Sequence, residues 1–182
     1  MKKNRLILMA FFCVLFLSAC YQHPNYHRIL PEKSNLVESN HLAASHLIKT
    51  AGDELDKKRV IITASFVNIN NLFDSSSFGR ISSQQVATQF TNSGYHVIEM
   101  LLGRDVIIKQ QQGEFLLSRR LKDIGMEHHA QAVLVGTYAI GNDYVYVTTK
   151  IIDTRNSKTI SSYDYRIPKD GDINDLLDNG SK

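Results

Sequence analysis

The spacing of apolar residues predicts three helices along the chain. Apolar residues recur at helical spacing from about Val37 to Leu55, with Asn40 as a polar break in the stripe. A second segment of this kind runs from about Phe78 to Asn92 and is followed by Gly94, a residue typical of helix ends. The third predicted helix runs from Glu114 to about Gly125.

Other segments are rich in β-branched residues and predict strands. Residues 59–69 form a near-continuous apolar run, which is typical of a strand buried on both faces of a sheet. Further strands are predicted at Tyr95–Leu101, at Ala132–Tyr138 and, shorter, at Gly103–Ile108. Two later segments, Tyr144–Ile152 and Thr159–Ile167, alternate between apolar and polar residues after polar turns, which predicts antiparallel hairpins at the sheet edge.

The predicted order of elements is α-β-α-β-α-β-β-β. Helices between the first three strands indicate parallel crossovers, and the hairpins add antiparallel strands. We therefore expect one α/β domain over residues 36–168, with helices packed on a mixed parallel and antiparallel sheet. Residues 169–182 are polar and acidic and are expected to form an irregular tail.

Residues 1–19 have the three parts of a secretory signal peptide. Three basic residues near the start (Lys2, Lys3 and Arg5) precede the apolar run Leu6–Leu17, and the small pair Ser18-Ala19 follows it. Because this run of about 12 residues is shorter than the ~20 residues that span a bilayer, a transmembrane anchor is the weaker interpretation.

The residues around Cys20 decide which kind of signal peptide this is. Leu17-Ser18-Ala19-Cys20 resembles the bacterial lipobox, in which the chain is cut before the cysteine. We predict S-diacylglycerol on the Cys20 thiol and N-palmitoyl on its new amino group; the alternative is a chance cysteine after an ordinary cleavage site. Cys13 lies in the removed segment, so lipidation accounts for the one cysteine of the mature chain.

Cleavage also changes the charge balance. The full chain has a formal charge of +3, and the removed segment contains three basic and no acidic residues, so the mature side chains sum to zero. The basic pI therefore gives no reason to expect nucleic-acid binding. Tyr21 favours the outer membrane, because Asp at this position is the usual signal for retention at the inner membrane. Residues 20–35 are expected to form a tether that reaches at most about 50 Å.

Catalytic motifs are absent from the sequence. It contains no G-x-S-x-G, no P-loop, no G-x-G-x-x-G and no H-E-x-x-H. The remaining thiol, Cys20, is predicted to be blocked by lipid. We therefore predict a protein that is not an enzyme and that uses no cofactor, metal, nucleic acid or small-molecule substrate.

The seven histidines are not spaced as metal ligands. The adjacent pair His128-His129 would point in different directions in a helix or a strand. His41 and His46 are five residues apart, which is off the spacing of one helical face, and His23 and His27 lie in the tether. We expect solvated surface histidines.

The polar loop Ser75–Ser77 follows a predicted buried strand and precedes a helix. Helix N–H groups at this place in an α/β sheet can hold an anion. The other interpretation is that a serine caps the helix while Gly79 permits close packing. The residues favour this capping role, because no glycine-rich turn is present to cradle a phosphate.

Aromatic and charged residues near the C-terminal half leave two points open. Tyrosines gather in the last strands, at positions Tyr138, Tyr144, Tyr146, Tyr163 and Tyr165. They fit half-buried edge positions and a protein contact surface equally well. Glu114 and the pair Arg119-Arg120 are expected to form a solvated or ion-paired face of the third helix.

Six segments occur in order over residues 36–168. They are Leu36–Asn40, Ala64–Asn68, Ser76–Ile81, Gly94–Glu99, Gly113–Arg119 and Ala130–Tyr138. Together they resemble the FlgO family of flagellum-associated outer-membrane lipoproteins. The resemblance implies a structural role in motility, in a ring around the flagellar basal body. The domain also resembles, more distantly, the N-terminal domain of TolB.

Two other classes of function stay open. The tether and the TolB-like fold are compatible with a periplasmic binding or regulatory lipoprotein that contacts a peptidoglycan synthase or a secretion complex. An unrecognised hydrolase would need a base near Ser75–Ser77. In either lipoprotein role, the expected partners are membrane lipid at Cys20 and other envelope or ring proteins. Association with further copies of the chain is an open alternative. The domain is expected to face the periplasm.

Overall fold

The computed structural model describes residues 35–72, 75–100, 123 and 125–178. The chain divides into two compact units, residues 1–30 and 31–182, and all of the described residues belong to the second. The strand expected at residues 103–108 and nearly all of the helix expected at 114–125 lie outside the described residues.

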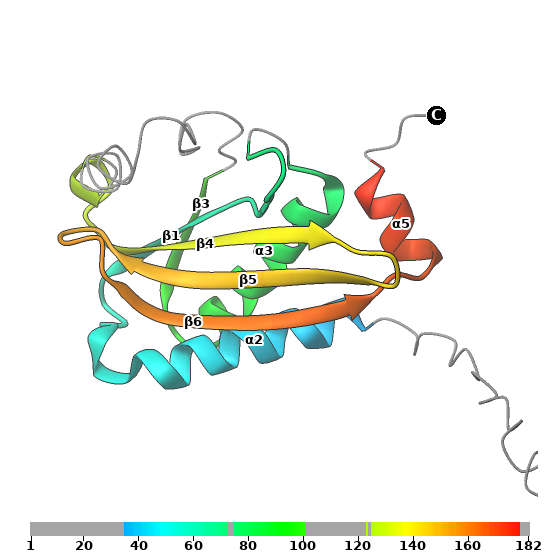
Figure 1. Ribbon diagram of the computed structural model, residues 1–182. Helices are drawn as coiled ribbons and strands as arrows, with labels where there is room; N and C mark the ends of the chain where they lie inside the picture. Colours follow the sequence, from blue (N-terminus) through cyan, green and yellow to red (C-terminus); the bar gives the residue numbers. More distant parts are fainter. Residues whose placement is uncertain (1–34, 73–74, 101–122, 124, 179–182) are drawn as a thin grey trace, which may run out of the picture. The chain divides into compact units, whose positions relative to one another are not determined.

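The β-branched runs form one mixed sheet, as the sequence predicts (Figure 1). Strands β1 (Val60–Ala64), β3 (His96–Met100) and β4 (Ala130–Ile140) are parallel to one another. Strands β5 (Tyr144–Asp153) and β6 (Thr159–Pro168) continue from β4 as antiparallel hairpins. The strand order β3-β1-β4-β5-β6 places the two hairpin strands at one edge, which confirms the predicted topology.

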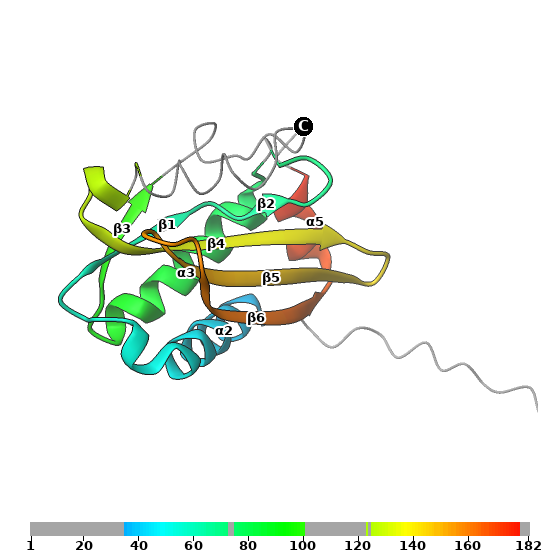
Figure 2. The same ribbon diagram turned by 60° about the vertical axis from the view of Figure 1, so that its left-hand side comes forward.

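Two helices cover one face of this sheet (Figure 2). Helix α2 (Leu36–Ala51) lies along β6, and α3 (Ser77–Asn92) packs beside α2 and over β3, β1 and β4. Asn35 and Ser76 cap the two helices, since their side chains accept hydrogen bonds from Glu38 N and Gly79 N. Because α2 packs against β6, the last strand of the sheet does not present its helix-facing side to solvent.

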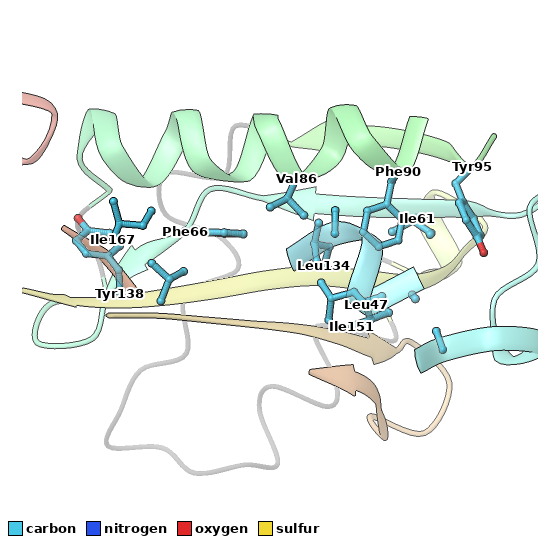
Figure 3. Packing of buried hydrophobic residues seen from close by; sticks show 14 of the residues in the cluster. Leu47, Ile61, Phe66, Val86, Phe90, Tyr95, Leu134, Tyr138, Ile151 and Ile167 are labelled. Carbon is cyan, nitrogen blue, oxygen red and sulfur yellow. The ribbon is translucent and has the colours of Figure 1, made fainter. Parts of the chain in front are cut away.

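The main core fills the space between the helices and the sheet (Figure 3). Side chains from both helices meet those of β1, β4, β5 and β6 there, and Phe66, Val86, Phe90 and Leu134 are fully buried. Each fully buried side chain of this size contributes about 1.5–3 kcal/mol relative to exposure. On the other face of the sheet, Ile62 belongs to a second, smaller cluster. The expectation that the first strand is buried on both faces is thus confirmed.

The ends of the first helix and first strand differ from the prediction. The helix ends at Ala51 instead of Leu55, because Gly52 adopts a positive φ of 50° and a short 3-10 turn, η1 (Gly52–Glu54), follows. The predicted strand 59–69 is interrupted after Ala64. It resumes as the two-residue strand β2 (Val67–Asn68), which pairs with β4.

Asn40 is a buried part of the core and not a polar interruption at the surface. Its side chain is 0% exposed. The Asn40 amide donates to Gln85 Oε1 at 2.7 Å, and Asn40 Oδ1 accepts a hydrogen bond from the Tyr165 hydroxyl. A buried amide is tolerated where its polar atoms are bonded in this way, and here it ties α2 to both α3 and β6.

The expectation of an irregular tail is wrong for part of the C-terminus. Residues Gly171–Leu177 form helix α5, with Asp170 as its N-cap and Ile173 buried beside α3. The sequence did not indicate this helix, because a capping aspartate and one buried isoleucine are too few residues to show helical spacing. Among the described helices, none is long and apolar enough to cross a membrane.

Candidate functional site

The predicted lipidation site, Cys20, lies outside the described residues. The predicted signal peptide 1–19 and the predicted tether 20–35 also lie outside the described residues, except for Asn35, which caps α2. Acylation of Cys20 therefore stays a prediction of the sequence. The sites that the structure does describe all belong to the domain.

The serine loop before α3 has a structural role. Ser75 Oγ donates to Phe66 O at 2.9 Å, and Ser76 Oγ accepts from Gly79 N at 3.3 Å. Ser77 Oγ accepts from Arg80 Nη2 at 3.0 Å. The capping interpretation is confirmed, and all three hydroxyl groups are engaged by the protein itself.

Tyr138 supports the same loop from the sheet. Its hydroxyl is buried, donates to Ser76 Oγ at 2.8 Å and lies 3.4 Å from Ser76 N, which donates to it. Tyr138→Phe should therefore lower the free energy of unfolding by about 1–2 kcal/mol, because the buried Ser76 loses a partner. Urea unfolding measures the change. Tyr146→Phe is the matched control: this ring is 51% exposed, so a change within about 0.5 kcal/mol is expected. Equal effects of the two variants would contradict the argument.

The five tyrosines of the last strands divide between the two faces of the sheet. Tyr138, Tyr163 and Tyr165 point toward the helices, and burial raises the pKa of the Tyr165 hydroxyl well above its ordinary value. Tyr144 and Tyr146 lie on the opposite face, where the guanidinium carbon of Arg166 is 4.4 Å from the Tyr144 ring centre. Tyr163 and Tyr165 are half-buried on the edge strand, as one interpretation expects, whereas Tyr138 is fully buried on an inner strand. The other interpretation, a protein contact surface, stays a prediction for the exposed Tyr146.

The histidines that the structure describes are dispersed over the domain. The His46 ring lies against Tyr163 in a tilted arrangement with ring centres 4.5 Å apart, whereas His96 lies on β3 and is exposed. His23 and His27 lie outside the described residues, as do Glu114 and Arg119-Arg120. Over the described ranges, no three His, Cys, Asp or Glu side chains come together as possible metal ligands.

A hollow of about 700 Å³ opens where β1 and β4 begin and β5 ends. Three of its lining residues are cationic, Lys58, Arg59 and Arg155, and His129 adds a titratable ring. Its apolar lining comes from Val60, Met126 and Ala130. The volume lies within the ~300–1,000 Å³ of typical ligand pockets, and none of the described residues that line it is acidic. We call this site the basic hollow.

Buried polar groups fix the backbone around the basic hollow. The Gln131 amide donates to Asp56 O at 2.6 Å and to Arg59 O at 3.0 Å, while its Oε1 accepts from Asp56 N at 2.9 Å. Thr154 Oγ1 donates to Ala130 O at 2.7 Å. The loops that present the cations are therefore held in place before any ligand binds.

Two residues that line the basic hollow, His129 and Gly125, have unusual backbone conformation or packing. His129 has a positive φ of 53°, and its ring nitrogen Nδ1 lies 3.0 Å from Met126 O. Gly125 packs so closely on Thr154 that an added Cβ would lie 2.6 Å from the threonine Cβ. Such left-handed non-glycine residues and close contacts persist only where the surrounding structure determines them.

One acidic residue lies just beside the basic hollow. Asp153 is buried, and Arg155 binds it through its backbone N–H and its guanidinium, with Nη2 2.6 Å from Oδ2. These hydrogen bonds hold the pKa of the Asp153 carboxyl below its usual range. Within the described residues, Lys58 and Arg59 have no acidic partner of this kind, so the hollow keeps its positive character.

Comparison with protein families settles the relationship of the chain. The family model described as FlgO protein matches residues 41–172. The chain belongs to the FlgO family. The match covers α2 from its second turn, all five long strands and the start of α5, so the basic hollow lies within the part shared with the FlgO family. Among curated proteins, none matches the sequence.

Solved structures share the fold of this FlgO-family domain. It is similar to the LpoB C-terminal domain from Salmonella enterica, with a TM-score of 0.53, 13% identity, and coverage of 74% of this chain and 99% of that one. The LpoB C-terminal domain from Escherichia coli gives a TM-score of 0.50 and 11% identity, covering 75% of this chain and 98% of that one. At such identities the likeness concerns the fold alone.

Sequence reasoning did not find the basic hollow. Its cations are spread from Lys58 to Arg155, nearly a hundred positions apart, and only the sheet topology brings them together. One signal was available. Gln131 is a long polar side chain at the start of an otherwise apolar strand, and a buried polar group of this kind must bind something.

Proposed function

We propose that this FlgO-family protein is a lipid-anchored outer-membrane protein with a structural, non-enzymatic role in an envelope ring of the flagellar basal body. The observation that carries the proposal is the match of the FlgO model to residues 41–172. The lipobox at Cys20 and the outer-membrane preference of Tyr21 support the location. The tether then connects the anchor to a periplasmic domain.

A structural role also fits the engaged polar groups of the domain. The hydroxyl groups of Ser75–Ser77 bind the link between β1 and β2, the first turn of α3 and Arg80, which supports a structural use of this loop. The fixed loops around the basic hollow and the exposed aromatic face around Tyr146 are features of binding surfaces. On this proposal the protein acts by contacting other envelope proteins.

A second candidate function is a periplasmic binding lipoprotein that contacts a peptidoglycan synthase or a secretion complex. The likeness of the fold to the LpoB C-terminal domain favours it. It shares the anchor and the tether with the first candidate, so localisation does not separate the two. The identity of the partner does.

Co-purification separates the two functions. The full chain, tagged after Lys182, is extracted from envelopes of the host with mild detergent and a reversible cross-linker. We expect flagellar basal-body proteins to be recovered at least tenfold over a matched sample from cells that produce the untagged chain. Recovery of a cell-wall synthase or a secretion pore without flagellar proteins would reject the ring role.

The anchor has its own test. Palmitate labelling should mark the wild-type chain and not Cys20→Ser, and the variant should move from the membrane fraction to the periplasmic fraction. Removal of the acyl chains takes away the signals that hold such a protein on a bilayer. Labelling of Cys20→Ser, or its retention in the membrane fraction, would contradict lipidation at this position.

A further inference from the structure

We propose that the basic hollow of one copy of this chain receives the acidic C-terminal end of a second copy, so that the protein assembles head to tail. The acidic end consists of residues 169–178, which contain four aspartates and one lysine and include α5. The biological meaning of this contact rests on the ring role proposed above. The contact itself is a physical property of the domain.

The basic hollow has the charge and the room for such a segment. Lys58 and Arg59 are exposed at its rim, and Arg155 stands beside them in its ion pair with Asp153. The part of the lining that the structure describes contains no carboxylate. Val60 and Ala130 give it an apolar floor. A carboxylate-bearing peptide segment with some apolar surface is the ligand that this lining complements.

The acidic end presents its carboxylates outward. Ile173 anchors α5 in the domain, whereas Asp172 and Asp175 are exposed. These two aspartates are three residues apart, so they lie on one side of the helix. Leu176 is only partly buried and offers apolar surface next to them. The segment therefore carries the pair of properties that the basic hollow complements.

The two sites lie at opposite ends of the domain (Figure 1). Strand β4 begins at Ala130 in the lining of the basic hollow and ends at Ile140, whereas β6 ends at Pro168, next to α5. An eleven-residue strand is about 35 Å long, so α5 cannot reach the hollow of its own copy. Contact between the two sites requires another copy.

A contact between two different patches has a specific consequence for assembly. Such heterologous interfaces do not close after two copies; they extend into a ring or a filament. A two-fold dimer would instead use the same patch on both copies. Head-to-tail contact is thus the kind of interface that a ring of lipid-anchored subunits needs.

Cross-linking in membranes tests the proposal. Met126 lines the hollow and is 68% exposed, and Asn174 is exposed on α5, so Met126→Cys and Asn174→Cys leave the charges unchanged. The full chain with both cysteines, treated with a short bis-maleimide in envelope fragments, should give a ladder of dimers, trimers and larger species. Either cysteine alone should give only the background of the unmodified chain. Two chains with one cysteine each, produced together, should stop at dimers.

Charge reversal supplies the second arm. Lys58→Glu/Arg59→Glu should reduce the ladder at least tenfold, because it places like charges in the contact. Lys49→Glu/Lys150→Glu changes the net charge equally, at exposed positions of α2 and β5, and should leave the ladder intact.

Three results would overturn head-to-tail assembly: no ladder from the chain with both cysteines, dimers from Met126→Cys alone, or a ladder insensitive to reversal of Lys58 and Arg59. None of them bears on motility. If the deletion strain does not swim but the cysteine variants give no ladder, this contact is rejected and the ring role is kept. If the cysteine variants give a ladder but the deletion strain swims normally, the contact is kept and the ring role is rejected.

Discussion

Phe66→Ala should lower the free energy of unfolding by about 3–5 kcal/mol, the usual cost of deleting a fully buried aromatic ring. Phe66 is 0% exposed and lies in the link between β1 and β2. Its ring fills the space left by the missing side chain of Gly136, where an added Cβ would lie 2.5 Å from the ring carbons. Its backbone N–H donates to Gly79 O at 3.2 Å, so the residue joins the sheet to α3.

The measurement is urea unfolding of the full chain, followed by circular dichroism. Ile69→Ala is the matched control, because Ile69 lies three residues further on and is 49% exposed. A loss of less than about 1 kcal/mol is expected there. Similar losses in both variants would show that Phe66 does not have the packing role described for it.

Gly79→Ala should also be destabilising, by about 3 kcal/mol. Helix propensity alone predicts the opposite sign, since Ala is favoured over Gly by about 1 kcal/mol within a helix. At Gly79, however, an added Cβ would lie 2.1 Å from the backbone oxygen of Phe66. The contact is with backbone, and the hydrogen bond from Phe66 N to Gly79 O holds α3 against it. Overpacking of this kind typically costs ~1–3 kcal/mol, occasionally more.

Gly171→Ala is the control for Gly79. Gly171 is the first residue of α5, and nothing lies within 4 Å of an added Cβ. The substitution should be neutral or stabilise by up to about 1 kcal/mol. Thermal unfolding of the two variants should therefore move in opposite directions, or at least differ by several degrees. An unchanged or raised melting temperature for Gly79→Ala would mean that α3 can shift away from the strand.

The sequence predicted those parts of the fold that depend on local pattern. The apolar runs of β1, β4 and the hairpin strands are long enough to indicate strands, and the serines of Ser75–Ser77 and Gly94 indicated the two ends of α3. Parallel crossovers followed from the helices between strands. These features need only nearby residues to specify them.

The parts that were missed depend on distant partners. The residues next to Phe66 in the sequence do not show that its side chain turns into the core, because the space for its ring is provided by Gly136 on another strand. Asn40 is buried because Gln85 and Tyr165 bind it. Helix α5 forms because Ile173 finds a site beside α3. Tertiary contacts override local preference in each case.

The basic hollow was missed for the same reason. It becomes a site only when the loops before β1 and β4 meet the turn after β5, and Gln131 joins two of these loops through its side chain. The register of the strands must be known before it can be predicted that these loops lie side by side. The signal at the N-terminus is different, because the lipobox around Cys20 is contiguous in sequence.

The proposed role of this protein in motility, from the outer membrane, predicts a swimming defect when its gene is deleted. The gene is deleted in its host, swimming is scored in soft agar, and basal bodies are imaged by electron cryotomography. We predict that swimming is lost or weakened and that an outer-membrane ring is missing. Wild-type protein should restore both, and Cys20→Ser at equal abundance should not. Normal swimming with intact rings in the deletion strain would contradict the account.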